Sequence, residues 1–255
     1  MNTPAEDGSR AREVPSGTLG TVHNAVTLLR LLAEGPAYQP LTDLAARSGM
    51  AVPTVHRLLR SLVVAGLVQQ DPTSSRYGLG PELARLAHAY LARLPVVKAL
   101  SPYLVEVRNT TGATVMVSLL VRDSVVYVDR IDGTDPERIY REAHAVHHAL
   151  ETAAGRVLAA RADDTSWALV TASAPTQVAD LADGQRDAWR NARYVLVAPD
   201  DLHDRGELAV PVLNGSGRVI AALSAALQRD GLEPELLVTD LERAAKAASR
   251  TVGHG

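Results

Sequence analysis

The stretch PTVHRLLRSLVVAG, residues 53–66, decides the fold of the first part of this chain. Its apolar side chains recur at helical spacing, so we expect a helix with one buried stripe. The residues of this stripe are Val55, Leu58, Leu59, Leu62 and Val63. Proline suits the first turn of a helix, where no amide is needed, and glycine suits the position beyond its end. The stretch therefore predicts a helix that begins at Pro53 and ends at Gly66.

The sequence on either side of this helix completes a larger motif. Upstream, apolar residues predict a helix over 21–34 and a short second helix from Leu41 that stops at Gly49. Downstream, residues 67–70 and 76–79 read as two strands around the turn DPTSS. Three helices followed by a hairpin form a winged helix-turn-helix, whose third helix enters the major groove of DNA.

The face of the third helix opposite the buried stripe is polar and basic. Arg57 and Arg60 can bond phosphates or guanine edges, and Arg76 on the wing can reach a phosphate or the minor groove. Residues 18–80 hold five basic and three acidic residues, so positive charge is local in a chain of net charge −3. The predicted DNA contacts are Thr42, Ala51, Val52, Thr54, His56, Arg57, Arg60, Ser61, Ser75 and Arg76. The alternative is that these arginines only form a solvated face.

The composition limits what the whole chain can be. A length of 255 residues, with 46% hydrophobic and 22% charged residues, fits a globular protein with a small and a larger domain. The absence of cysteine excludes disulfides, thiol nucleophiles and thiolate metal sites. Residues 1–17 are polar and resemble no secretion signal, and no apolar run approaches the roughly 20 residues that span a bilayer. We expect a cytoplasmic protein without membrane contact.

The rest of the chain reads as a connecting helix followed by an α+β domain. The helix begins at Pro81 and ends before Pro95. Its apolar stripe packs either on the winged domain of the same chain or on a second copy, and we favour a dimer contact. Strands are expected over 113–121 and 124–131, joined by a tight turn. Later strands are expected over 194–198, 207–213 and 218–227, and helices over 153–162, 165–172, 177–192 and 233–251.

These elements divide the chain into four parts, because antiparallel strands with intervening helices make a separate α+β domain. The parts are a disordered tail (1–17), a winged helix-turn-helix DNA-binding domain (18–80), a linker helix (81–97) and a larger α+β domain (98–255).

With these residues in place, the chain resembles the IclR family of bacterial regulators over about residues 18–250. The stretches that carry the resemblance are PTVHRLL (53–59) with GLV (66–68) and YGLG (77–80), VYVDRI (126–131), and TAAGRVLAA (152–160) with LAVPV (208–212) and residues 217–224. The resemblance implies a winged helix-turn-helix joined to an antiparallel-sheet α/β domain of GAF-like fold, and it makes residues 98–255 the effector-binding and oligomerisation domain. It also implies that a small organic acid or aromatic metabolite controls DNA binding.

The resemblance places the effector between the sheet and the start of the helix at 152–156. Free amides at a helix N-terminus attract an anion, and small residues there let a carboxylate approach the backbone. The expected effector contacts are Thr152, Ala153, Ala154, Gly155, Arg156, Asp204, Glu207 and Ser224. The alternative is that the small residues only allow tight helix packing.

Several positions depart from the family pattern. Pro53 replaces a serine at the start of the recognition helix, which removes a hydroxyl and an amide that could hold a phosphate. Leu150 and Ala226 stand where a histidine and a second serine are common in the family. Glu207 would disfavour an anion placed against it.

Two other classes of function compete with a DNA-binding regulator. His144 and His148 are four residues apart and would share a helix face as metal ligands, which would favour a metal-dependent or other small-molecule enzyme. However, no glutamate completes such a motif, and the segment reads as extended, so we expect no metal, cofactor or catalytic residue. The second alternative is a winged helix that binds protein rather than DNA. Our prediction is a homodimer or homotetramer on a DNA operator, with a repressor favoured over an activator.

Overall fold

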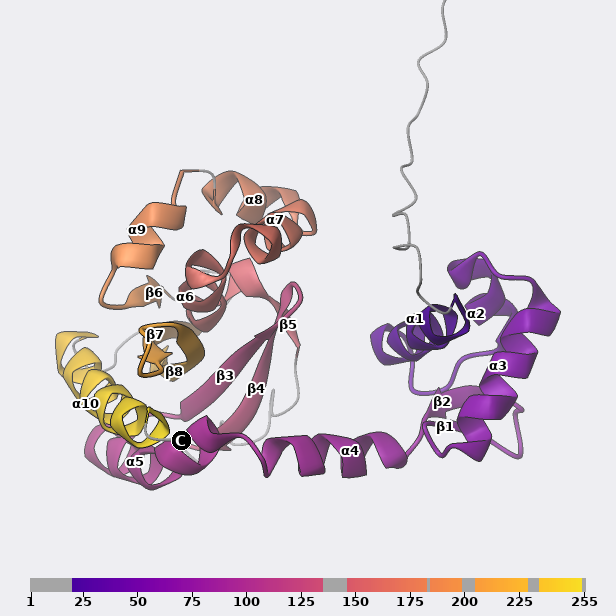
Figure 1. Ribbon diagram of the computed structural model, residues 1–255, viewed down its shortest axis with the longest axis horizontal. Helices are drawn as coiled ribbons and strands as arrows, with labels where there is room; N and C mark the ends of the chain where they lie inside the picture. The colour runs from indigo at the N-terminus through magenta and orange to yellow at the C-terminus, as the bar shows by residue number, and fades with distance from the viewer. Residues whose placement is uncertain (1–19, 135–145, 183, 199–204, 229–233, 254–255) are drawn as a thin grey trace, which may run out of the picture. The chain divides into compact units, whose positions relative to one another are not determined.

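The computed structural model describes residues 20–134, 146–182, 184–198, 205–228 and 234–253, which form two compact units (Figure 1). One unit ends at Tyr90 and the other begins at Leu91, within the segment predicted as a linker. The expected tail over 1–17 lies outside the described residues.

The first unit consists of three helices, a two-stranded hairpin and a fourth helix. Its elements are α1 (Gly20–Glu34), α2 (Leu41–Ser48), α3 (Val52–Val64), β1 (Val68–Gln70), β2 (Tyr77–Leu79) and α4 (Glu82–Leu91). Gly49 follows α2 with φ of 67°, a left-handed conformation that lets the chain turn sharply toward α3. The strands pair antiparallel, with Val68 opposite Leu79. This order confirms the winged helix-turn-helix.

The core of this unit forms where the three helices meet. The side chains of Leu28, Leu44, Val55 and Leu59 are completely buried there. The stripe expected on the third helix is confirmed except at Val63, which is 37% exposed. Each helical residue rotates the side chain by ~100°, so Val63 turns away from the core that Leu62 enters.

A buried polar side chain, Gln39, connects the end of α1 to the wing. Its amide nitrogen donates to three backbone oxygens, those of Leu31 (3.0 Å), Leu32 (3.2 Å) and Pro36 (3.3 Å). The Gln39 backbone exchanges two hydrogen bonds of 2.8 Å with Tyr77 of β2, and Arg47 donates to the Gln39 side-chain oxygen at 2.7 Å. Gln39 therefore fixes the wing relative to the helices.

Replacing Gln39 with Leu should lower the free energy of unfolding by about 2 to 3 kcal/mol, because buried carbonyl oxygens and Arg47 lose their partner. Urea unfolding followed by circular dichroism measures this change. Gln70→Leu is the matched control, since the exposed Gln70 side chain donates one bond, to the Ser75 oxygen. Equal losses in the two variants would show that Gln39 is not the connection.

The second unit contains a six-stranded sheet with helices on both faces. Its strands are β3 (Val115–Val121), β4 (Ser124–Ile131), β5 (His147–His148), β6 (Val195–Val197), β7 (Arg205–Leu213) and β8 (Val219–Gln228). Its helices are α5 (Pro95–Thr111), the 3-10 helix η2 (Ala149–Glu151), α6 (Ala153–Arg161), α7 (Asp164–Ala172), α8 (Thr176–Ala182), α9 (Arg186–Asn191) and α10 (Pro234–Val252). All neighbouring strands pair antiparallel in the order β5-β4-β3-β8-β7-β6, which confirms the α+β class.

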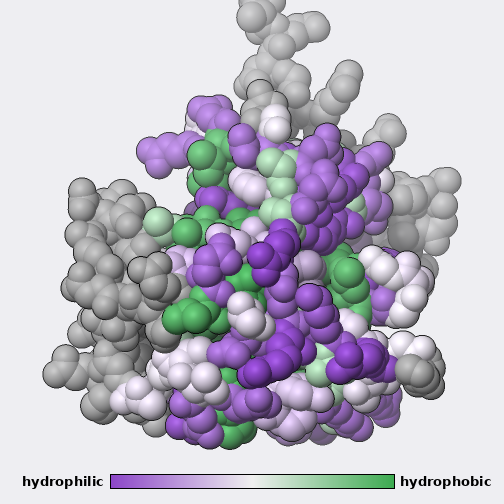
Figure 2. All heavy atoms as spheres, turned by 90° about the vertical axis from the view of Figure 1, so that its left-hand side faces the viewer, coloured by the Kyte–Doolittle hydropathy of each residue, from purple (hydrophilic) through white to green (hydrophobic). Residues whose placement is uncertain are grey.

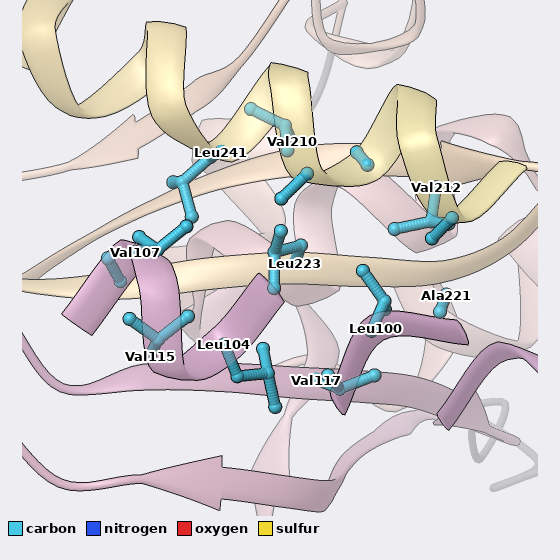
Figure 3. Close-up of a cluster of buried hydrophobic side chains, with 14 of the residues drawn as sticks. Leu100, Leu104, Val107, Val115, Val117, Val210, Val212, Ala221, Leu223 and Leu241 are labelled. Carbon is cyan, nitrogen blue, oxygen red and sulfur yellow. The ribbon is translucent and has the colours of Figure 1, made fainter. Parts of the chain in front are cut away.

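The two faces of this sheet pack against different helices. On one face, α5 and α10 cover a core that includes Leu104, Val117, Leu223 and Leu241 (Figure 3). On the other face, α6 packs against side chains such as Val125, Ala209 and Ala222. Strand side chains alternate between the faces, so the residues of β3, β7 and β8 that do not enter the α5–α10 core point toward α6.

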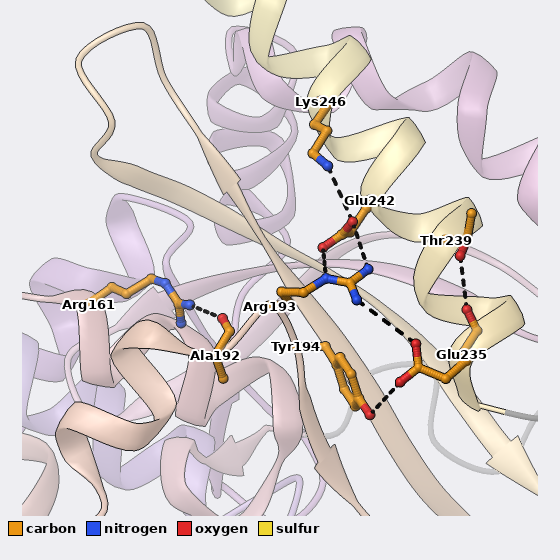
Figure 4. A network of polar contacts seen from close by, with 8 residues as sticks. All are labelled: Arg161, Ala192, Arg193, Tyr194, Glu235, Thr239, Glu242 and Lys246. Atoms are coloured by element: carbon orange, nitrogen blue, oxygen red, sulfur yellow. Dashed lines mark hydrogen bonds and ion pairs between the residues drawn. The ribbon is translucent and has the colours of Figure 1, made fainter.

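Polar contacts hold α10 against the segment that leads into β6. Arg193 donates two hydrogen bonds to Glu242, at 3.1 and 3.2 Å, and Lys246 donates to the same carboxylate at 3.2 Å (Figure 4). The Tyr194 hydroxyl donates to Glu235 at 3.2 Å. Polar side chains cover much of the surface on this side of the molecule, between smaller apolar patches (Figure 2). Exposed ion pairs of this kind add little stability.

The helices of the second unit differ from the prediction in two places. Helix α5 was not expected, because Pro95 was read as the end of the connecting helix, whereas it lies in the first turn of a new one. The single helix expected over 177–192 is two helices, separated where Gly184 takes φ of 70°. The tight turn after β3 is confirmed, with Arg122 at φ of 62°.

Candidate DNA-binding surface and effector site

The exposed face of α3 presents a continuous polar surface. His56, Arg57, Arg60 and Ser61 are exposed, and with Val64 they line an open groove along the helix. Their spacing of three and four residues places them on one side of α3, opposite the buried leucines. The structure therefore brings together four of the predicted DNA contacts on one helix face.

The start of α3 lies next to this face. Ala51 precedes the helix with extended backbone, and Val52 and Pro53 occupy its first turn, all three being exposed. Thr54 is half-buried, so it is less accessible than predicted. Thr42 is exposed in the first turn of α2. These residues are accessible to a ligand, apart from the partly covered Thr54.

The turn of the wing is shaped by Asp71. Its carboxylate accepts hydrogen bonds from the amides of Thr73 (3.2 Å) and Ser74 (3.0 Å) and from the Ser74 hydroxyl. These bonds hold the pKa of Asp71 below its ordinary value. Ser75 completes the turn with φ of 56°, and both Ser75 and Arg76 are exposed. The wing thus presents both of its predicted DNA contacts.

Not every arginine of this unit is available to a ligand. Arg47 contributes to the local positive charge, but its side chain donates to Gln39 and to the Leu31 oxygen, and it lies 3.6 Å from Glu34. By contrast, within the described residues Arg57, Arg60 and Arg76 form no ion pair. The net charge of the segment therefore does not identify its contact residues.

In the second unit, polar side chains gather on the sheet face that α6 covers. Ser224 of β8 pairs with Ala209 of β7, two residues beyond Glu207, so Ser224 and Glu207 share this face. Ser118 of β3 lies opposite Tyr127 of β4 and on the same face. Ser118 and Ser224 are completely buried, and Glu207 is 9% exposed. We call Ser118, Tyr127, Glu207 and Ser224 the polar cluster.

Glu207 joins the polar cluster to the start of α6. One carboxylate oxygen accepts the Ala154 amide at 3.2 Å, and the other accepts the Tyr127 hydroxyl at 3.4 Å. Thr152 caps the same helix, accepting the Gly155 amide at 2.9 Å. The expectation that these amides are free for an anion is therefore wrong, because side chains of the protein already accept them.

Burial raises the pKa of Glu207 above its ordinary value, although the Ala154 amide and the Ser224 and Tyr127 hydroxyls act in the opposite direction. The folded protein thus keeps this proton at pH values where the unfolded chain has lost it. Its contribution to stability is fully present below the ordinary glutamate pKa and is lost as pH rises through the raised one.

Glu207→Gln, which carries no titrating group, should therefore gain stability relative to the unmodified protein as pH rises from about 4 to about 8. Thermal unfolding across this range measures the gain. Glu242→Gln is a control of opposite sign, because the hydrogen bond from Arg193 lowers the pKa of Glu242. A Glu207→Gln difference that does not vary with pH would contradict the assigned burial.

The remaining expected effector residues do not all face the polar cluster. Ala153 and Ala154 are buried at the start of α6. The guanidinium group of Arg156 lies 5.2 Å from the ring centre of Trp189, and its Nε donates to the Leu150 oxygen at 2.8 Å. Asp204 lies outside the described residues.

Sequence reasoning missed two members of the polar cluster, Ser118 and Tyr127. A signal was present for Ser118, which interrupts the apolar run VMVSLLV on a strand that was correctly expected. What the sequence could not show is that Tyr127 reaches Glu207, which lies 80 positions further along the chain.

The histidines that suggested a metal site are placed differently. His147 and His148 form the short strand β5, which confirms an extended segment, and His144 lies outside the described residues. His148 Nδ1 accepts the Leu150 amide at 3.2 Å and therefore stabilises the start of η2. Within the described residues no group of three or more metal-ligating side chains comes together.

None of the helices in the described residues is both long and apolar enough to cross a membrane.

Two family models match the chain: the IclR helix-turn-helix domain over residues 21–72 and the bacterial transcriptional regulator IclR C-terminal domain over residues 88–181.

Individual relatives match this chain over nearly its whole length. The glycerol operon regulatory protein of Streptomyces griseus is 30% identical, across 92% of this chain and 97% of its own length. The regulator XynR of Escherichia coli is 26% identical with the same coverage. These relatives are transcriptional regulators, which argues against the enzyme alternative.

Solved structures of other proteins share the fold of this chain. The crystal structure of an IclR transcriptional regulator from Silicibacter sp. TM1040 superposes with a TM-score of 0.78 at 26% identity, over 92% of this chain and 96% of that one. An IclR homologue from Microbacterium hydrocarbonoxydans, complexed with 4-hydroxybenzoate, shares the fold with a TM-score of 0.70 at 20% identity, over 92% and 100%. The chain belongs to the IclR family of bacterial transcriptional regulators.

Proposed function

We propose that this chain is a cytoplasmic repressor that binds a near-palindromic operator as a homodimer and responds to a small-molecule effector. The observation that carries the DNA-binding part is the exposed face of α3. Arg57 and Arg60 lie there without an ion pair among the described residues, whereas Arg85, Arg186 and Arg193 are each paired with a carboxylate. Free guanidinium groups on a recognition helix are suited to phosphates and guanine edges.

Helix α4 supports the homodimer. None of its residues is buried, and two of its large apolar side chains, Leu86 and Tyr90, are 46% and 57% exposed. Together with Leu83, Ala87 and Leu91 they form an apolar stripe at helical spacing. A second copy of the chain would cover this stripe and place two recognition helices on one operator. Such dimers could pair further into tetramers.

The effector part of the proposal rests on the polar cluster beneath α6. The buried hydroxyl groups of Ser118 and Ser224 have no hydrogen-bond partner among the described residues, and a bound molecule can supply one. The Microbacterium homologue, which binds 4-hydroxybenzoate, supports a small-molecule effector for this chain. A ligand can change operator affinity only if it binds the DNA-competent state and the other state unequally.

Footprinting on DNA selected from genomic fragments, combined with sedimentation of the complex, tests this function. We expect two protected half-sites separated by a whole number of helical turns and a complex of two or four chains. A single protected site with one chain would overturn the homodimer. Protection of no preferred sequence would favour the protein-binding alternative.

A further inference from the structure

The start of α6 already holds a carboxylate that belongs to the protein. Glu207 accepts the Ala154 amide, and it is buried beside two residues of the sheet, Tyr127 and Ser224. A helix N-terminus carries a partial positive charge that favours an anion. Here an oxygen of the Glu207 carboxyl group occupies that position from β7, so a ligand carboxylate would have to displace it or lie against it.

The charges around Glu207 are balanced without a ligand. The positive end of α6 faces the Glu207 carboxyl group, and burial favours the neutral form of this group and raises its pKa. Arg130, on the same sheet face opposite Met116, is neutralised by Asp132 at 2.7 Å from its Nε. A ligand anion would find the Ala154 amide already occupied by Glu207 and would be buried without that partner, and a ligand cation would face the positive end of α6. An uncharged ligand meets neither penalty.

The buried hydroxyl groups specify what such a ligand must carry. The Oγ atoms of Ser118 and Ser224 are buried and make no hydrogen bond of good geometry, although Ser224 lies near enough to Glu207 to lower its pKa. A serine hydroxyl can both donate and accept, and the Glu207 carboxylate accepts. Ligand hydroxyl groups complement both kinds of partner, since each can donate to Glu207 and accept from a serine.

We propose that the effector is an uncharged compound with several hydroxyl groups, of the polyol or sugar class, and that Glu207 excludes small carboxylic acids by occupying their position at α6. This inference rests on the proposed function, because it assigns the ligand class of the same effector site. It reverses the small organic acid expected from the family resemblance.

Matched pairs of ligands test the class directly. The probes are glycerol, erythritol, xylose and glucose, each compared at equal concentration with its acid: glycerate, erythronate, xylonate and gluconate. Calorimetry on the full-length protein should show binding of at least one neutral compound, at least tenfold tighter than its acid. If no neutral compound binds, or if an acid binds as tightly as its neutral partner, the proposal is overturned.

Acetate tests whether Glu207 occupies the position at which a ligand carboxylate would bind the Ala154 amide. Glu207→Ala leaves the Ala154 amide without its acceptor, so acetate should raise the melting temperature of this variant but not of the unmodified protein. Sodium chloride at equal ionic strength controls for salt. Glu151→Ala is the matched control, because Glu151 is an exposed carboxylate that accepts the His148 amide at a helix start. Acetate should not raise the melting temperature of this control. Equal responses in all three proteins would contradict the proposal.

Glu207→Gln serves if Glu207→Ala does not fold, because glutamine keeps an oxygen for the Ala154 amide but carries no charge. Because this oxygen still occupies the Ala154 amide, the affinity of Glu207→Gln for the acids should stay close to that of the unmodified protein, and a tenfold rise would contradict exclusion by the occupied position. Operator binding is measured on the same preparations. Acid binding by a protein that still recognises its operator overturns only the ligand class, whereas loss of operator recognition by the unmodified protein overturns the proposed function.

Discussion

Arg57→Ala should weaken operator binding by about 1 to 3 kcal/mol, because the side chain lies exposed on α3 without an ion pair among the described residues. Fluorescence anisotropy on operator and unrelated DNA, each at two salt concentrations, measures the loss. A lost guanine contact would reduce operator affinity more than affinity for unrelated DNA. A lost phosphate contact would reduce both and would lower the salt dependence by about one released ion.

The matched control is Arg243→Ala, which removes the same charge from α10. Arg243 pairs with Glu106 and Asp240 on the surface of the second unit, so its loss should leave DNA affinity unchanged. If both variants bind the operator as tightly as the unmodified protein, α3 does not face DNA in the way proposed. If both lose affinity equally, the effect comes from net charge alone.

Gly155→Ala should lower the free energy of unfolding by about 3 kcal/mol or more. An added Cβ would lie 1.9 Å from the backbone oxygen of Ala149 and 2.6 Å from its carbonyl carbon, so no flexible side chain can move aside. Because Gly155 lies in α6 next to the Thr152 cap, the start of the helix would shift and the Ala154 amide would move away from Glu207. Calorimetric melting of the full chain measures the loss.

Gly20→Ala is the control for this substitution, because an added Cβ at Gly20 in α1 meets no atom within 4 Å. It should change the free energy of unfolding by less than about 0.5 kcal/mol. A Gly155→Ala protein that melts like Gly20→Ala would show that η2 does not pack against α6 as closely as described.

The winged unit could be predicted from the sequence because its signals are local. The apolar spacing of α3 and the glycine at position 49 each determine structure within a few residues. The connection through Gln39 could not be predicted, since it joins α1 to the wing across 38 positions, from Gln39 to Tyr77. Helix α5 was missed because a proline after a helical pattern was read as the end of that helix, whereas α4 ends at Leu91 and Pro95 lies in the first turn of α5.

The effector site was only partly predictable for the same physical reason. The start of α6 could be located from its cap residue and small side chains. That Glu207 would accept the Ala154 amide depends on the pairing of β7 with β8 and on the packing of α6, which no local pattern encodes. The Ala154 amide, which the sequence suggested was available to an anion, is therefore already bonded to a side chain 53 positions away.

The most direct test is a gel shift of the purified protein on the intergenic DNA upstream of its own gene, at two salt concentrations, with unrelated DNA as competitor. Phosphate contacts give every DNA-binding protein salt-dependent affinity, so only binding that survives the competitor demonstrates sequence recognition. We predict a specific complex that persists in the competitor and weakens in Arg57→Ala. Binding that the competitor abolishes, both here and on DNA selected from the whole genome, would contradict the account.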